Sequence, residues 1–83
     1  MDQRTAELSA DISKLEATFG ELTQFMTPSE LQAVCDFNPL VQDVPRMAKA
    51  CWVYERLLDL RTRLDEHRYN IQVSEQLFCQ CFD

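Results

Sequence analysis

A heptad repeat of apolar residues near the start of the chain constrains its fold more than any other feature. The repeat alternates between steps of four and three residues, and its members are Leu8, Ile12, Leu15, Phe19, Leu22 and Met26. Residues at such a spacing line one stripe of an α-helix, about 80° wide at ~100° per residue. A stripe this narrow suits a single partner helix. The pattern predicts a helix over about residues 3–26 in an all-α fold, either a helical hairpin or a small helical bundle.

A helix-start signal follows directly after this repeat. Thr27 is placed to cap a helix with its hydroxyl, the next residue is a proline that fits the first helical position, and Glu30 completes a capping box. A residue that precedes proline avoids the helical region, so this second helix must end before Asn38-Pro39. The sequence predicts a short capped helix over about 28–37, followed by a connector.

Pro45 restarts the chain as a long helix, predicted over about residues 45–68. Its apolar residues form two interleaved stripes, one of Met47, Cys51, Tyr54 and Leu58 and the other of Ala50, Val53, Leu57, Leu60 and Leu64. Together the stripes span about 180° of the helix, roughly twice the width of the first repeat. A face this wide can contact two neighbours, and we expect the first helix to be one of them.

The helical pattern weakens in the C-terminal tail. Helical spacing places Ile71, Phe78 and Phe82 on one side of a further helix over 71–82, which is either separate from the third helix or continuous with it. Residues 69–73 also alternate like a short strand. Of these two interpretations we predict the helix.

Size and composition exclude several classes of protein. The 83 residues fit a single small helical domain, 1–83, and 46% of them are apolar, which argues against disorder. One Gly and three Pro leave little material for the turns of a multi-strand sheet. No apolar run approaches the ~20 residues that span a bilayer, and the first residues lack the apolar core of a signal peptide. We therefore expect no membrane partner and an intracellular, reducing location, cytoplasmic or nuclear.

The net charge of −6 falls entirely in the first half of the chain. Residues 1–43 hold eight acidic and two basic residues, whereas residues 44–83 hold six of each. An acidic balance argues against binding to nucleic acid, which needs clustered Lys and Arg. An acidic first helix and a mildly basic third helix favour pairing with each other, but the charged faces are equally consistent with plain solvation.

Little in the sequence indicates a catalytic or cofactor site, and we predict neither enzyme activity nor a cofactor. The only histidine, His67, falls in a charged run typical of the solvated end of a helix. Cys35 and Cys51 occupy apolar helical positions, where Cys behaves as a small hydrophobe. Cys79 and Cys81, the one closely spaced pair, would diverge by ~200° on a helix and could not share a metal ion. A Cys-based metal or redox module is the third hypothesis. In an extended tail Cys79 and Cys81 would share a side, and Cys35, Cys51 or His67 could complete a metal site.

Trp52 is the residue most out of pattern, because it falls on the polar face of the third helix. Either the second helix or the connector folds back over it, or it contacts a partner with Arg56 stacked on its ring. The apolar tail offers a second candidate surface through Leu77, Phe78 and Phe82. These five residues are the predicted partner-binding residues.

The leading functional hypothesis is a non-catalytic helical interaction subunit or adaptor. It would bind a protein partner, another protein or a second copy of itself, through apolar helix faces. The alternative is an acidic inhibitor or decoy, such as a phage-type protein or nucleic-acid mimic, that occupies a basic surface of its target. Added salt separates these two hypotheses, because it weakens a charge-driven complex far more than an apolar one.

Overall fold

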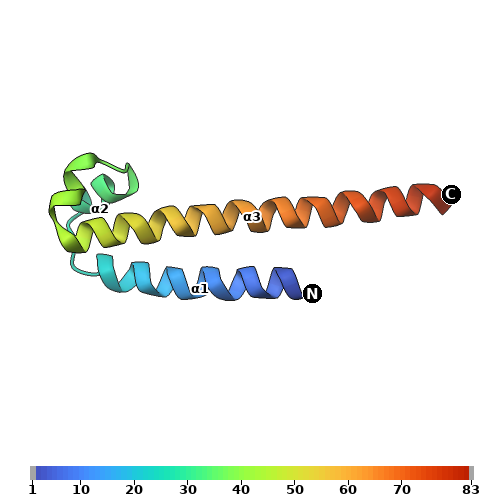
Figure 1. Ribbon diagram of the computed structural model, residues 1–83, viewed down its shortest axis with the longest axis horizontal. Helices are drawn as coiled ribbons and strands as arrows, with labels where there is room; N and C mark the ends of the chain where they lie inside the picture. The colour runs from blue at the N-terminus through green and yellow to red at the C-terminus, as the bar shows by residue number, and fades with distance from the viewer. Residues whose placement is uncertain (1, 83) are drawn as a thin grey trace.

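The computed structural model describes the backbone of residues 2–82 and the side chains of residues 2–76. Along this part of the chain lie helix α1 (Gln3–Thr23), helix α2 (Pro28–Cys35), the 3-10 helix η1 (Pro39–Asp43) and helix α3 (Pro45–Phe82), with no strand. The all-α prediction is confirmed. Figure 1 shows α1 running antiparallel to α3 along one side of it, while α2 and η1 pack at the start of α3 on the other side.

The hairpin of α1 and α3 is held together by the predicted heptad seam. One buried cluster combines the first seam residues with the facing residues of α3: Leu8, Ile12, Leu57, Leu60 and Leu64, with Leu15 packed against them. The charged residues between the seam positions are exposed, as the repeat requires: Asp11, Lys14, Glu16 and Glu21. Burial of this apolar seam, at ~25 cal/mol per Å² removed from water, is the main attraction between the two helices.

A second cluster fills the closed end of the hairpin, where α2 and η1 meet α3. Val34 of α2, Val41 of η1 and two residues of α3, Ala50 and Cys51, are buried together. The second half of the seam packs against this cluster from the other side: Phe19, Leu22 and Met26. The broad apolar face of α3 therefore contacts α1 on one side and α2 with η1 on the other, and the expectation that α1 is one of its neighbours is confirmed. Val41 is a core residue that the sequence pattern did not indicate, because it lies in the connector.

The first helix ends at Thr23, earlier than the predicted residue 26. Proline at position 28 disfavours helical geometry at Thr27, which is extended (φ −70°, ψ 160°) and caps α2. The predicted capping box is confirmed: the Thr27 N–H donates to Glu30 Oε1 over 2.9 Å, and the Glu30 N–H donates to Thr27 Oγ1 over 3.2 Å. Residues 24–27 are needed for the turn into this cap, so α1 stops before it.

The second helix ends at Cys35 and not at residue 37, because Phe37 has a left-handed backbone (φ 56°). Two hydrogen bonds close the helix end in the Schellman pattern. The Asn38 N–H donates to the Ala33 carbonyl over 3.0 Å, and the Phe37 N–H donates to the Val34 carbonyl over 3.1 Å. These bonds turn the chain out of α2 and into η1.

The third helix runs unbroken from Pro45 to Phe82, so the segments predicted at 45–68 and 71–82 form one helix of 38 residues. No proline or glycine follows Pro45. The ~0.7 kcal/mol that Asn or Tyr costs in a helix interior is too small to stop a long helix. The placement of His67 is corrected by the same continuity, since it lies within α3 and not at a helix end.

The difference in length between α1 and α3 gives the molecule an elongated shape of 59 × 20 × 17 Å. The final part of α3 projects past the N-terminal end of α1 (Figure 1). In residues 2–82, none of the helices has the length and apolar character needed to cross a membrane.

Candidate partner-binding surface

Trp52 is exposed on α3, with 62% of its surface accessible to water. Of the two interpretations of this residue, the one in which α2 or the connector covers it is wrong, because those elements pack on the residues of α3 that form the closed-end core. The neighbouring side chains on this face of α3 are polar. A large aromatic side chain exposed among them is unusual.

Trp52 borders a groove between α1 and α3 with a volume of about 220 Å³. Six residues line the groove, three from each helix: Asp11, Lys14, Leu15, Trp52, Arg56 and Leu60. Leu15 and Leu60 also belong to the hairpin seam, so the apolar floor of the groove is continuous with the core. Sequence reasoning found Trp52 and Arg56 but missed the contribution of α1, whose only signal is the position of Leu15 in the heptad repeat.

The guanidinium of Arg56 pairs with a carboxylate of its own helix. Its Nη1 lies 3.4 Å from Asp59 Oδ2, and Nε of Arg63 lies 3.1 Å from the same oxygen. Trp52, Glu55, Arg56 and Asp59 line a further hollow of about 310 Å³ on the outer face of α3. Each of these ion pairs is about half exposed, and exposed pairs contribute only ~0–1 kcal/mol. Arg56 is therefore free to exchange Asp59 for another acceptor at little cost.

The tail residues Leu77, Phe78 and Phe82 lie on the helical backbone of α3, but their side chains are outside the described residues. The preceding turns carry Tyr69, which is 66% exposed, and Ile71, which is half-buried. Twenty-five residues separate Trp52 from residue 77, a distance of ~37 Å at 1.5 Å per residue. The predicted binding residues thus fall in two separate stretches of α3.

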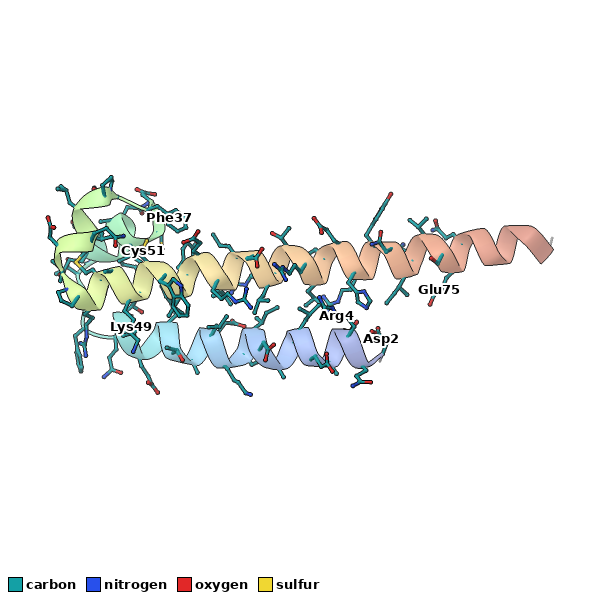
Figure 2. The ribbon with its side chains drawn as sticks, viewed as in Figure 1. Asp2, Arg4, Phe37, Lys49, Cys51 and Glu75 are labelled. Atoms are coloured by element: carbon teal, nitrogen blue, oxygen red, sulfur yellow. The ribbon has the colours of Figure 1, made fainter. Side chains whose placement is uncertain are left out.

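The open end of the hairpin is joined by a polar contact that sequence reasoning missed. Nε2 of His67 lies 2.9 Å from Oδ1 of Asp2, the residue that caps α1. Asp2 also accepts hydrogen bonds from the Thr5 N–H over 3.0 Å and from the Thr5 hydroxyl over 2.7 Å. The hydrogen bonds from His67 and Thr5 hold the pKa of Asp2 well below its usual value. Figure 2 shows Asp2 at the start of α1, beside the C-terminal half of α3.

The expected pairing of an acidic α1 with a basic α3 is represented by an ion pair near the middle of the hairpin. Nη2 of Arg61 lies 3.5 Å from Oε2 of Glu16, and both side chains are about half exposed. Such a pair contributes ~0–1 kcal/mol. Charge therefore orients the two helices, and the apolar seam holds them.

The thiols of Cys35 and Cys51 are free. Burial, with smaller contributions from Glu55 and Cys35, raises the pKa of the Cys51 thiol, which makes this thiol a poor nucleophile. Within the part of the chain that the structure describes, no group of three or more His, Cys, Asp or Glu residues is arranged to hold a metal ion. Cys79 and Cys81 lie on the helical backbone of α3 and not in the extended tail that the metal hypothesis needs, and their side chains are outside the described residues.

Comparisons with protein-family models, with curated proteins and with solved structures find no match. The surface of the hairpin has an exposed tryptophan beside an apolar groove, with charges of both signs on the rim of the groove.

Proposed function

We propose that this chain is a non-catalytic helical interaction subunit, an adaptor that binds a helix of another protein along the α1–α3 groove. The observation that carries the proposal is the 62% exposure of Trp52 at the edge of a groove floored by Leu15 and Leu60. Trp is among the residues most enriched in binding hot spots, where it anchors a partner in a desolvated pocket. An exposed Trp on an otherwise polar helix face has no role in the core of this hairpin.

A helix is the partner element that best fits the shape and charge of the groove. The groove lies between two antiparallel helices, and an amphipathic helix would lay its apolar face along them. Lys14 and Arg56 offer positive charges on the rim, while Asp11 offers a negative one. Charges of both signs set the orientation of a partner without making the affinity depend on them.

The decoy hypothesis is supported by a different observation, the exposed acidic surface of α1. Glu7 and Glu21 are both exposed, and neither lines the α1–α3 groove. A basic target would be drawn to this surface by charge, and its affinity would fall steeply as salt screens the interaction. The two proposals therefore place the interface on different faces and differ in their response to salt.

The free thiols of Cys35 and Cys51 support the further proposal of a reducing, intracellular compartment for this protein. Elemental analysis of the purified chain for zinc tests the metal hypothesis separately. We expect no stoichiometric zinc, and one equivalent per chain would revive that hypothesis.

The adaptor proposal is tested by identifying the proteins that co-purify with the tagged chain and measuring the affinity of the purified partner. We expect Trp52→Ala to weaken binding about thirtyfold or more, the loss typical of a hot-spot Trp. Tyr69→Ala is the matched control, because Tyr69 is an equally exposed aromatic of α3 outside the groove. Equal binding by Trp52→Ala and wild type would contradict the proposal. Loss of affinity in salt, together with loss of affinity in Glu7→Lys and Glu21→Lys, would establish the decoy in its place, because neither residue lines the groove.

A further inference from the structure

Helix α3 continues well past the point where α1 begins. The contact between Asp2 and His67 shows which residue of α3 lies beside the start of α1, because Asp2 is the N-cap of α1. Residues 68–82 lie beyond it in the same helix, a projection of ~22 Å at 1.5 Å per residue. Figure 2 labels Glu75 on this projection, with no other described helix alongside.

The stripe of α3 that packs on α1 continues into the projection. Leu57 and Leu64 are buried against α1, and residues at further steps of seven are Ile71 and Phe78. Steps of seven keep a residue on nearly the same side of a helix. One apolar row of the seam therefore continues along α3 past the start of α1, whereas the row of Leu60 continues as His67 and Ser74.

The projection is also nearly uncharged, unlike the helix before it. Residues 55–68 contain eight charged residues, whereas residues 69–82, a stretch of equal length, contain only Glu75. A solvated helix end normally carries charged residues on most of its surface. An apolar seam with so little charge is typical of a helix face that another helix covers.

We infer that residues 68–82 pair with the same segment of a second copy of this chain, in an antiparallel, two-fold symmetric dimer. This interface lies apart from the Trp52 groove, so the inference goes beyond the proposed function. Low charge suits self-pairing, because two copies of a strongly charged segment would repel each other. Within residues 68–82 each copy contributes only two charged residues, Arg68 and Glu75, which have opposite signs.

The position of α1 decides the direction of pairing. In a parallel pair with facing seams, the α1 helices of both copies would occupy the same space beside Leu57 and Leu64. In an antiparallel pair the two hairpin bodies lie at opposite ends. The partner's projection then continues the line of α1 along the seam and runs in the same direction as α1 does (Figure 1). A two-fold axis uses the same patch on both copies and so closes the assembly at two.

The size of the interface indicates a weak dimer. Two Phe residues in each projection bury ~150–250 Å² apiece when fully covered. Four of them, with smaller contributions from Ile71 and its neighbours, reach roughly the 1,200 Å² lower bound of stable interfaces. We therefore expect monomer and dimer to exchange at micromolar concentrations.

Analytical ultracentrifugation of the full chain from about 1 to 300 µM, a range that brackets a micromolar dissociation constant, tests this inference. Reducing agent is present throughout, because the chain has four cysteines. We expect a monomer–dimer equilibrium in which Ile71→Glu weakens the dimer at least tenfold. Gln76→Glu is the control, because it adds the same charge to the same segment about 140° away from Ile71 around the helix. A chain that stays monomeric, or an Ile71→Glu variant that dimerises like wild type, would overturn the inference.

Small-angle X-ray scattering of the dimer tests its direction. Two molecules of 59 Å that share their projections give a longest dimension of about 95 Å, since the overlap is ~22 Å. A parallel or fully side-by-side pair would stay near 60 Å, and that result would overturn the antiparallel arrangement. Trp52→Ala separates the two proposals, because we expect this variant to dimerise normally. Loss of the dimer in Trp52→Ala would place self-association at the groove and contradict the projection interface.

Discussion

At the scale of single residues, Phe37 is the most unusual position in the fold. Its left-handed backbone (φ 56°) costs an L-residue about 1–2 kcal/mol, which is why glycine is preferred at the end of a helix. The ring offsets part of this cost. Its centroid lies 5.8 Å from that of Tyr54, which in turn stacks on Phe19 at 5.3 Å. Aromatic pairs of this kind contribute ~0.5–1.5 kcal/mol.

Replacing Phe37 separates the effect of its backbone from that of its ring. Phe37→Ala loses the ring and keeps the strained backbone, whereas Phe37→Gly loses the ring but relieves the strain. We expect Phe37→Gly to be more stable than Phe37→Ala by about 1 kcal/mol, measured by urea unfolding followed by circular dichroism. The reverse order would mean that residue 37 does not adopt the left-handed conformation in solution.

Asp2 makes the stability of the hairpin depend on acid pH. Its pKa is lowered in the folded chain by His67 and Thr5, so ionised Asp2 stabilises the fold above the unfolded-state pKa of about 4. This stabilisation is lost as the pH falls from there through the lowered folded-state pKa. We expect Asp2→Asn, which keeps a capping side chain, to lower the melting temperature at neutral pH.

The gap between wild type and Asp2→Asn should narrow steadily below about pH 4, because protonation removes the same charge from the wild type. Asp11→Asn, a change of an exposed acid on the same helix, is the control and should leave the melting temperature nearly unchanged. A gap for Asp2→Asn that stays constant into strong acid would show that the charge of Asp2 does not hold α1 against α3.

At the scale of the helices, the seam between α1 and α3 carries most of the stability. Leu57 is 2% exposed at the centre of this seam, and Leu→Ala at such a site costs about 2–5 kcal/mol. A chain of this size has a total free energy of unfolding of only ~4–12 kcal/mol. We therefore expect Leu57→Ala to lower the midpoint of urea unfolding strongly or to unfold the chain even without urea.

Leu40→Ala is the matched control for Leu57→Ala. Leu40 is 72% exposed in η1, so the same change removes little buried surface and should shift stability by less than about 0.5 kcal/mol. Equal shifts for the two variants would mean that the seam is not the core of the hairpin.

At the scale of the whole molecule, the projection of α3 dominates the shape. The radius of gyration is 17.5 Å, whereas a compact chain of this length has a value of ~12 Å. We expect scattering from dilute solution to give a radius near 17–18 Å once extrapolated to the monomer. A value near the compact one would mean that the end of α3 folds back on the hairpin.

The sequence by itself determined the features that depend on neighbouring residues. The heptad seam predicted α1 and its burial, Thr27 and Glu30 predicted the cap of α2, and Pro45 predicted the start of α3. Helical periodicity and capping act over a few residues, so a local pattern is sufficient to predict them. Trp52 was singled out for the same reason, since its place on a polar face follows from spacing alone.

Only the tertiary structure decided which surfaces the elements cover. Trp52 is exposed because α2 and η1 pack on the apolar face of α3, which also draws Val41 of the connector into the core. The length of the projection follows from the level at which Asp2 meets His67, a contact between residues 65 positions apart. Such long-range contacts depend on the register of two helices against each other, and that register is a balance of packing over the whole seam that no local pattern specifies.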